Sequence, residues 1–490
     1  MIINVEVDIS NGMPTWEIVG LPDASVRESK ERIRTAIKNT GIELKSKRYV
    51  INLSPANFRK DGAIMDLAIT VAILNAMEII KEYDTKNTIF IGELSLNGDI
   101  KKVNGVLPIC VEAVKHNIKR ILLPYENYKE ASIIKGLEII PVKNILEVIK
   151  FLNRELNLPK PDIENEINYI KDDGIDFSEV KGQENIKRAL EIAASGGHNC
   201  LLIGTPGSGK TMMARRITTI LPDLSFEEAL EITKIHSIAG ILKNNSLVSE
   251  RPFRSPHHTV SGVGLIGGGK IPKPGEISLA HYGVLFLDEL LEFKKNTLEV
   301  LRGPLEDKIV TITRSNMTLT YPCNFMLIAS MNPCPCGYLG SKEIECSCTE
   351  IQKKNYKAKL SGPMLDRFDI QVQVNSVKFK DLSEKEGESS EQIKQRVNNS
   401  RKIQLERYKN ENIYSNSELT QSLIKKYCKI DYESEKILSI AFEKLKLSAR
   451  AYTKIIKVAR TIADIENCMN IEKKHIIEAI EYRSLDKNGW

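Results

Sequence analysis

A glycine-rich stretch, residues 204–211, is the part of this chain whose residue types and spacing indicate chemistry most clearly. Its glycines let backbone N–H groups turn toward a phosphate chain, Lys210 places a positive charge on the β- and γ-phosphates, and the Thr211 hydroxyl can bind Mg²⁺. An apolar run at 200–203 and a predicted helix at 212–220 supply the strand and helix that this motif requires. The predicted nucleotide-binding residues are Gly204, Thr205, Pro206, Gly207, Ser208, Gly209, Lys210 and Thr211.

Two adjacent carboxylates follow another predicted buried strand. Residues 284–287 form a continuous apolar run that ends in Asp288 and Glu289. We expect Asp288 to hold Mg²⁺ through water and Glu289 to polarise the water that attacks the γ-phosphate. With the phosphate loop, this pair predicts hydrolysis of a nucleoside triphosphate with Mg²⁺, but it does not indicate what the hydrolysis drives.

Three further polar residues occur in the order that is typical of AAA+ ring ATPases. Asn332 follows a second apolar run and resembles the sensor-1 residue that orients the attacking water. Arg367 resembles the arginine finger that reaches the γ-phosphate of a neighbouring subunit, since a guanidinium is always charged and forks onto phosphate oxygens. Arg450, at the start of a predicted helix, resembles a sensor-2 arginine. For both arginines the alternative is a surface ion pair of small energy.

Four cysteines form a tight cluster in the sequence: Cys334, Cys336, Cys346 and Cys348. Four thiolates can complete a tetrahedral Zn²⁺ shell and leave no open position, so the pattern predicts a structural zinc site, with free thiols or a redox pair as the alternatives. His257 and His258 are adjacent to each other in the sequence, and adjacent side chains on an extended chain face opposite ways. We therefore expect them to form hydrogen bonds and not to bind one metal ion together.

Length and composition describe a soluble, multidomain class of protein. The chain has 490 residues, of which 42% are hydrophobic, and 70 basic against 64 acidic residues give a net charge of +6. About three domains are expected for this length. No apolar run approaches a membrane span and no signal peptide opens the chain, so we expect a cytoplasmic protein that does not enter a membrane. The modest positive charge is compatible with nucleic acid but does not establish it.

The hydrophobic pattern predicts several structural regions. In the first region, strands are expected at 2–9, 49–53, 88–91 and 120–123, and helices at 25–39, 65–80 and 106–116. Near the C-terminus, helices are expected at 432–445, 449–466 and 472–483. The predicted organisation is an N-terminal domain at 1–155, a linker at 156–176, a nucleotide-binding domain at 177–377, a charged connector at 378–416 and a helical lid at 417–490.

Long segments of the chain resemble the magnesium-chelatase-like AAA+ proteins of the YifB/ComM family. They include MNPCPCGY at 331–338, LSGPMLDRFDI at 360–370 and the segments 7–37, 254–293, 301–314 and 448–465. The resemblance implies an α/β P-loop AAA+ core with a C-terminal helical lid, preceded by an α+β domain like ribosomal S5 domain 2 and Lon protease. It also implies a bacterial ATPase that uses ATP and Mg²⁺. The best-understood member of this family, a competence protein, is a hexameric DNA helicase that promotes branch migration, so the resemblance implies single-stranded or branched DNA and a homo-hexamer as the expected partners.

Two segments of the predicted core could grip a substrate. The glycine-rich segment 257–280 corresponds in relatives to a hairpin near the ring pore, and 308–321 has the alternating pattern of a second hairpin. Lys270, Lys273 and Arg314 could contact phosphates of DNA, a contact that does not depend on base sequence. The alternative is that they are ordinary surface charges.

The Lon-like resemblance of the first domain does not predict a protease. By that resemblance the catalytic Ser falls near Ile64 and its Lys partner near Leu107, and neither side chain can act as nucleophile or base. A DNA motor is therefore the favoured function. The alternative is a motor that remodels a protein partner, as in magnesium chelatase, and DNA-stimulated ATP turnover would distinguish the two.

Overall fold

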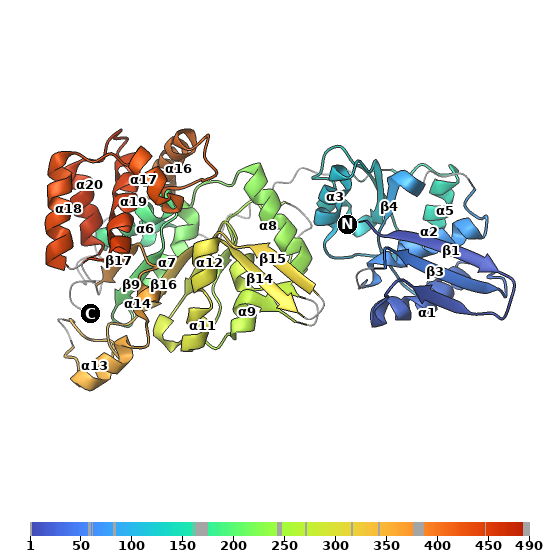
Figure 1. Cartoon of the computed structure of the whole chain (residues 1–490), viewed down its shortest axis with the longest axis horizontal. Helices are drawn as coiled ribbons and strands as arrows, with labels where there is room; N and C mark the ends of the chain where they lie inside the picture. Colours follow the sequence, from blue (N-terminus) through green and yellow to red (C-terminus); the bar gives the residue numbers. More distant parts are fainter. Residues whose placement is uncertain are drawn as a thin grey trace. The chain divides into compact units, whose positions relative to one another are not determined.

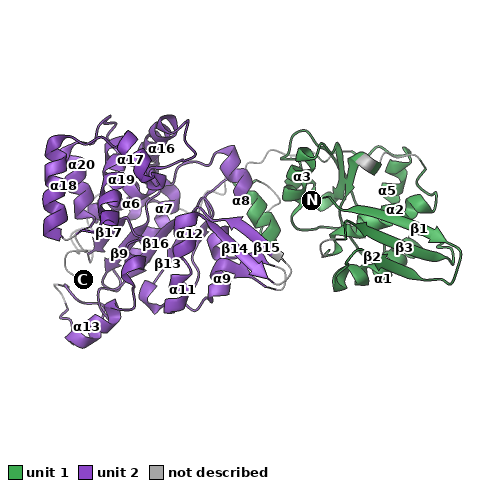
Figure 2. Ribbon diagram, in the orientation of Figure 1, with its two compact units in different colours: residues 1–168, 233–248 green, residues 169–232, 249–490 purple. Residues whose placement is uncertain are grey.

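The computed structural model describes residues 2–56, 60, 62–81, 85–159, 161, 175–242, 247–269, 272–314, 317–341, 344–375, 387–445 and 447–483. The chain divides into two compact units, coloured separately in Figure 2. Unit 1 comprises residues 1–168 and 233–248, and unit 2 comprises residues 169–232 and 249–490. Helix α8 (Phe226–Ala239) therefore contributes its first part to unit 2 and its last part to unit 1.

Unit 1 contains two three-stranded sheets with helices packed on them (Figure 1). In the central strand β3, Tyr49, Ile51 and Leu53 are buried and alternate with more exposed residues, as expected for a strand with one face on the core. The first sheet has the order β1 (Asn4–Ser10), β3 (Arg48–Ser54), β2 (Trp16–Val19), and the second, parallel sheet has the order β4 (Thr88–Phe90), β7 (Arg120–Pro124), β8 (Glu138–Val142). The other elements are a small ladder of β5 (Glu93–Leu94) and β6 (Ile100–Lys101), and helices α1 (Ala24–Asn39), α2 (Asp66–Ala76), α3 (Val106–Lys115), α4 (Tyr128–Ala131) and α5 (Ile145–Leu152).

The two positions that correspond to the Lon dyad are apolar packing positions in unit 1. Ile64 lies in the short 3₁₀ turn Ala63–Met65 and packs against the hydrophobic core, while Leu107 in α3 is fully buried. Both side chains serve packing, and neither offers a group that could attack a peptide bond.

Unit 2 is built on a five-stranded sheet in which every neighbouring pair is parallel. Its order is β10 (Phe253–Arg254), β13 (Val284–Leu287), β16 (Met326–Met331), β9 (Cys200–Gly204), β17 (Ile370–Val374). Both faces are covered, so β9, β13 and β16 are buried at every position, as expected for a central parallel sheet. The carboxyl ends of β9, β13 and β16 meet at one edge, where the predicted nucleotide residues follow them.

The helices of unit 2 surround this sheet (Figure 1). Leu202 of β9 faces the core formed with α6 and the C-terminal helices, whereas Leu201 and Ile203 face the other core. Within the described residues, the helices besides α8 are α6 (Glu184–Gly196), α7 (Lys210–Ile220), α9 (Gly262–Ile266), α10 (Glu276–Leu279), α11 (Lys295–Glu299), α12 (Arg302–Asp307), α13 (Glu350–Lys357), α14 (Gly362–Leu365), α16 (Ser390–Arg407), α17 (Gln421–Tyr427), α18 (Tyr432–Leu445), α19 (Ala449–Ile465) and α20 (Lys473–Glu481).

The expected C-terminal helices are confirmed. Helices α18, α19 and α20 match the predicted ranges to within two residues at each end. Ser448 caps α19 by accepting a hydrogen bond from the backbone amide of Ala451, which explains why the helix begins there. None of the described helices combines the length and apolar character that a membrane crossing requires.

Candidate nucleotide-binding site

The predicted phosphate loop lies between β9 and α7, as its sequence context requires. Gly207 and Gly209 have φ angles of +75° and +85°, a region that favours glycine. Gly204 has no room for a side chain, since a Cβ there would lie 2.4 Å from the carbonyl oxygen of Val374 on β17. The loop conformation therefore depends on glycine at these positions, and its backbone N–H groups can surround an anion.

Lys210 is held inside the loop. Its Nζ donates to the carbonyl oxygens of Gly204 and Thr205, at 2.8 Å each, and to Oδ1 of Asn332 at 3.2 Å. Burial lowers the pKa of Lys210, while the charges of Asp288 and Glu289 oppose that shift. Asn332 follows β16, whose Met331 is paired with Ile203 of β9, so the two strands bring Asn332 and Lys210 together.

Thr211 and Asp288 lie close together beyond the carboxyl ends of β9 and β13. The Thr211 hydroxyl donates to Oδ2 of Asp288 over 2.6 Å, and the Ser330 hydroxyl donates to Oδ1 of the same carboxylate. The backbone amide of Glu289 also donates to Asp288 Oδ1, at 3.1 Å. A hydroxyl and a carboxylate at this spacing fit the oxygen ligands of Mg²⁺ in nucleotide sites. Ser330 had no motif that would reveal it in the sequence, because it becomes a neighbour of Asp288 only through strand pairing.

Glu289 directly follows Asp288 in an uncommon backbone conformation. Its φ of +51° is rare for a residue with a side chain, and such conformations cluster at functional sites. Its side chain is 60% exposed, and Oε2 lies 3.8 Å from Nδ1 of His258. The carboxylate is thus largely open to solvent, with His258 as its neighbour. The sequence favoured a hydrogen-bonding role for the His257–His258 pair but did not connect it with Glu289.

The two predicted arginines are not joined to Lys210 or Asp288 by any hydrogen bond or ion pair within the described residues. Arg367 follows α14, has a side chain that is 9% exposed, and forms an ion pair with Glu306 of α12. Its Nε is buried without a partner in the described part of the chain. Arg450 is exposed in the first turn of α19. For Arg367 to reach a neighbouring subunit, it must exchange Glu306 for a phosphate group.

A buried ion pair beside Arg367 connects the sheet to the C-terminal helices, and it was not anticipated from the sequence. Asp369 Oδ1 lies 2.9 Å from Nζ of Lys454 in α19, and Asp369 Oδ2 accepts from the backbone amide of Asn199 at 3.0 Å. Burial opposes the charge of Asp369, but Lys454 and His198 outweigh it and hold the pKa of that carboxyl well below its usual range. The Asn199 side chain also donates to the carbonyl oxygen of Arg367 at 3.0 Å.

Replacing Asp369 by Asn is expected to lower the free energy of unfolding by about 3–5 kcal/mol near neutral pH, because Lys454 would remain buried without its carboxylate. A depressed folded-state pKa contributes stability that is complete above the unfolded pKa of about 3.9 and is lost as pH falls through the folded-state value. The difference in the free energy of unfolding between wild type and Asp369→Asn, measured by urea unfolding, should therefore be constant between about pH 7 and 5 and should become smaller below about pH 4. The exposed Asp307→Asn should change stability by less than about 0.5 kcal/mol. Equal effects of both variants would contradict this assignment.

The four cysteines are brought together in the loop that follows Asn332. Their Sγ atoms all lie within 4.8 Å of one another. The Sγ of Cys334 lies 3.3 Å from that of Cys336 and 3.7 Å from that of Cys346, and the last two are 3.6 Å apart. A backbone hydrogen bond from Tyr338 lowers the pKa of the Cys336 thiol to about 6. This geometry is compatible with Zn²⁺.

The two hairpins expected to meet DNA are present and pack against each other. Strands β14 (Ile309–Arg314) and β15 (Met317–Pro322) form an antiparallel ladder, which confirms the second hairpin, and β11 (Gly267–Gly268) pairs with β12 (Lys273–Pro274) in the first. The Tyr321 hydroxyl donates to the carbonyl oxygen of Pro272 at 2.9 Å. A Cβ on Gly268 would lie 2.9 Å from Nη2 of Arg314, so this arginine lies against the first hairpin. Lys273 and Arg314 are both exposed, whereas Lys270 lies outside the described residues.

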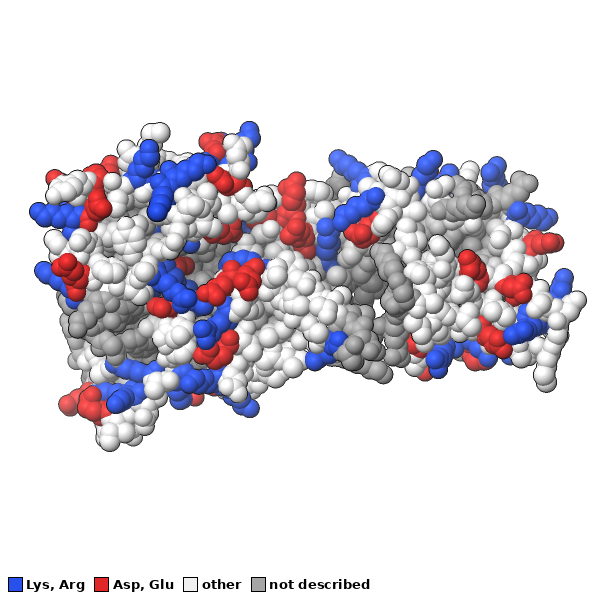
Figure 3. All heavy atoms as spheres, viewed as in Figure 1, with Lys and Arg blue, Asp and Glu red and all other residues white. Residues whose placement is uncertain are grey.

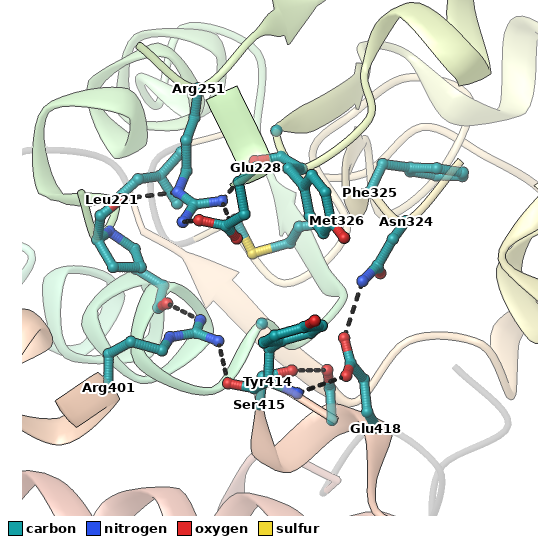
Figure 4. Close-up of a pocket in the computed structure, with 16 residues that line it drawn as sticks. Leu221, Glu228, Arg251, Asn324, Phe325, Met326, Arg401, Tyr414, Ser415 and Glu418 are labelled. Atoms are coloured by element: carbon teal, nitrogen blue, oxygen red, sulfur yellow. Dashed lines mark hydrogen bonds and ion pairs between the residues drawn. The ribbon is translucent and has the colours of Figure 1, made fainter. Parts of the chain in front are cut away.

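A cavity in unit 2 is distinct from the nucleotide site (Figure 4). Arg251 forms an ion pair with Glu228 on one wall, and Arg401 donates to the carbonyl oxygen of Tyr414 at 2.9 Å on another. Burial lowers the pKa of Arg401. None of the residues lining this cavity belongs to the phosphate loop or to the carboxylate pair. It lies near the amino ends of β13 and β16, at the sheet edge opposite the predicted catalytic residues.

Comparisons with known proteins agree with this architecture. The family model described as magnesium chelatase, subunit ChlI, matches residues 176–382, and models for subunit ChlI of Mg-chelatase and for its C-terminal part match residues 5–127 and 387–483. The chain is 42% identical over 488 residues to the uncharacterized protein YifB of Escherichia coli, covering 99% of this chain and 94% of that protein. It is 39% identical over 489 residues to competence protein ComM of Haemophilus influenzae, covering 99% of this chain and 95% of that one.

A shorter similarity connects the chain with Lon protease 2 of Bacillus subtilis, at 32% identity over 149 residues, 28% of this chain and 26% of that enzyme. It accounts for the Lon-like character of the N-terminal region. The family of the whole chain follows from the three magnesium-chelatase models and the full-length matches. The parallel sheet and the helical C-terminus agree with it. This protein belongs to the YifB/ComM family of magnesium-chelatase-like AAA+ ATPases.

Proposed function

We propose that this protein forms a hexameric ring that couples ATP hydrolysis to the remodelling of DNA, by unwinding or branch migration. The observation that carries the proposal is the packing of two hairpins into one surface on the same unit as the candidate nucleotide site. This surface, the hairpin surface, consists of β11–β12 and β14–β15 and exposes Lys273 and Arg314. The name of the relative ComM, a competence protein, supports DNA as the substrate.

In the proposed mechanism, different residues of this chain have separate roles in phosphoryl transfer. Lys210 and the loop amides bind the β- and γ-phosphates, and Thr211 and Asp288 would hold Mg²⁺, which neutralises phosphate charge when it is bound. Asn332, already beside Lys210, orients the attacking water, and the Glu289 carboxylate accepts its proton. Arg367 of a neighbouring subunit stabilises the charge that develops on the γ-phosphate, and Arg450 links nucleotide state to the helical lid.

On the face drawn in Figure 3, the charge distribution favours a local DNA contact over a broad basic patch. Figure 3 shows Lys and Arg side chains interspersed with Asp and Glu on the face drawn of the described residues. Non-specific DNA binding requires basic residues that neutralise phosphates, so the exposed arginine and lysine of the hairpin surface are the expected contacts. The exposed threonines Thr311, Thr313, Thr318 and Thr320 lie on the other face of the β14–β15 hairpin from Arg314, so they are not part of this contact.

Arg314→Ala is expected to weaken the stimulation of ATP turnover by DNA while basal turnover stays at the wild-type level, because Arg314 does not contact the nucleotide residues. Loss of one phosphate contact should also reduce the slope of log affinity against log salt by about 1. The measurement is ATP turnover with single-stranded, duplex and forked DNA at several salt concentrations. Lys425→Ala, an exposed lysine on α17, is the matched control and should behave as wild type.

Turnover that is indifferent to every form of DNA would count against a DNA motor. The outcome would then favour the alternative function, a motor that remodels a protein partner. Unwinding of a labelled forked duplex by wild type, and its loss in Glu289→Gln, would support the DNA motor.

A further inference from the structure

The cysteine loop lies directly against the candidate nucleotide site. Gly337, one residue after Cys336, has a φ of +87°, and a Cβ there would lie 2.5 Å from Cδ and 2.7 Å from Cγ of Pro206 in the phosphate loop. The same Cβ would lie 3.9 Å from Cγ of Asn332. The loop thus contacts both the phosphate-binding residues and the residue expected to orient water.

The arrangement of the four sulfur atoms fits a metal ion better than a set of free thiols. A Zn–S bond of about 2.3 Å places the sulfurs of a tetrahedral site about 3.8 Å apart. The three separations among the sulfurs of Cys334, Cys336 and Cys346, 3.3, 3.6 and 3.7 Å, are close to this value, and the sulfur of Cys348 lies within 4.8 Å of them. Backbone amides of Leu339 and Cys336 donate to the sulfurs of Cys334 and Cys348, at 3.3 Å each, and so hold these two sulfurs in place.

We propose that Cys334, Cys336, Cys346 and Cys348 bind one Zn²⁺ ion, and that the loop closed by this ion holds the phosphate loop and Asn332 in their working positions. Four thiolate ligands leave no open position on zinc, so the ion is structural and takes no part in the reaction itself.

The loop has little regular structure of its own to fix it. The described residues between Asn332 and the start of α13 at Glu350 include no helix or strand. After Cys348 the chain enters α13, which is capped by Thr349. Tyr356 of this helix is buried and lines the same hollow as Asn332 and Pro335. A metal at the cysteines would therefore fasten the loop at both ends to residues that touch the nucleotide site.

Metal content tests the zinc site without any reference to catalysis. Full-length protein purified without chelators should contain about one zinc ion per chain, and cobalt in its place should give the visible absorption of a tetrahedral thiolate centre. Cys346→Ser should lower the zinc content, whereas Cys428→Ser, at a cysteine that belongs to no group of possible metal ligands among the described residues, should not. Metal-free wild-type protein in which all four cluster thiols are free or oxidised would overturn the zinc site.

Two glycines of the same loop test the connection to the phosphate loop. Gly337 and Gly340 have similar φ angles of +87° and +80°, so alanine strains the backbone alike at both, but a Cβ on Gly340 meets nothing within 4 Å. Gly337→Ala should displace Pro206 and lower ATP turnover by about 10²-fold, since misplacement of a catalytic group by about 1 Å has an effect of this size. Gly340→Ala should retain most turnover, and both variants should keep their zinc. Equal turnover in the two variants would overturn the connection.

The connection to Pro206 rests on the proposed ATP site, whereas zinc binding does not. Binding of a fluorescent ATP analogue distinguishes a failure of the proposed ATP site from a failure of the zinc site. If wild-type protein bound no ATP, the proposed function would fail, and the metal content would still decide the zinc site. If wild type bound and hydrolysed ATP, removal of zinc with a chelator should reduce turnover and added zinc should restore it. Full turnover by zinc-free protein would contradict the proposed role of the ion.

Discussion

Glu289→Gln is expected to lower ATP turnover by about 10²- to 10⁴-fold while ATP binding is retained, because the amide cannot accept a proton from the attacking water. The structure supports this role through the position of Glu289, which directly follows the carboxylate bonded to Thr211 and keeps a side chain that is 60% exposed. Gln has nearly the same size as Glu, so the backbone at φ +51° and the Asp288 contacts should persist. Steady-state turnover and the affinity for a fluorescent ATP analogue are the two measurements.

Glu292→Gln is the matched control for this substitution. Glu292 lies three residues further along the same turn, is exposed, and its carboxylate is 3.7 Å from Nζ of Lys359. It has no assigned role in hydrolysis, so turnover should stay within about twofold of wild type, as expected for an exposed ion pair of small energy. Full turnover by Glu289→Gln, or an equal loss in both variants, would remove Glu289 as the general base.

Arg367→Ala is expected to bind ATP as wild type does but to hydrolyse it about 10³-fold more slowly, because the transition state would lose a positive charge that the neighbouring subunit supplies. The same substitution also breaks the ion pair with Glu306. Glu306→Gln separates the two roles: it removes the ion pair but leaves the arginine available to phosphate. If Arg367 serves only that ion pair, Glu306→Gln should reproduce the loss.

A mixture of two inactive variants tests whether Arg367 acts between subunits. Lys210→Ala subunits lack the phosphate-binding lysine but keep Arg367, and Arg367→Ala subunits have the reverse defect. In a mixed ring, some interfaces combine an intact loop with an intact arginine, so turnover should partly recover. Recovery would not occur if the arginine acted within its own chain, or if the protein remained monomeric with nucleotide bound.

The sequence predicted those parts of the site that consist of adjacent residues. The phosphate loop follows a strand and begins a helix as expected, because glycine spacing and hydrophobic runs are local properties. The hairpin of β14 and β15 was likewise predicted, since Val310 and Ile312 alternate with exposed threonines. The helices at the C-terminus were predicted from their three- and four-residue spacing. The limits of the predicted domains and the roles of the individual site residues stay predictions.

Some elements of unit 1 were not expected from the sequence. Strand β8 and helix α5 follow each other at Glu138–Val142 and Ile145–Leu152, but short apolar runs of this kind do not distinguish a strand from a buried helix. The sequence also contains no local signal that helix α8 is shared between the two units. Its residue Ser237 accepts a hydrogen bond from the backbone amide of Gly105 at 3.1 Å, a partner 132 residues away in the chain.

The sequence by itself indicated the candidate chemistry of this protein: a phosphate loop, a carboxylate pair and a cluster of four cysteines. Only the tertiary structure decided which distant residues act together. Ser330 beside Asp288, His258 beside Glu289, and Gly337 against Pro206 are contacts between segments far apart in the chain. A motif reflects the local conformation of a few residues, whereas such contacts arise when parallel strands are paired and loops pack at their carboxyl ends, which depends on the burial of the whole core.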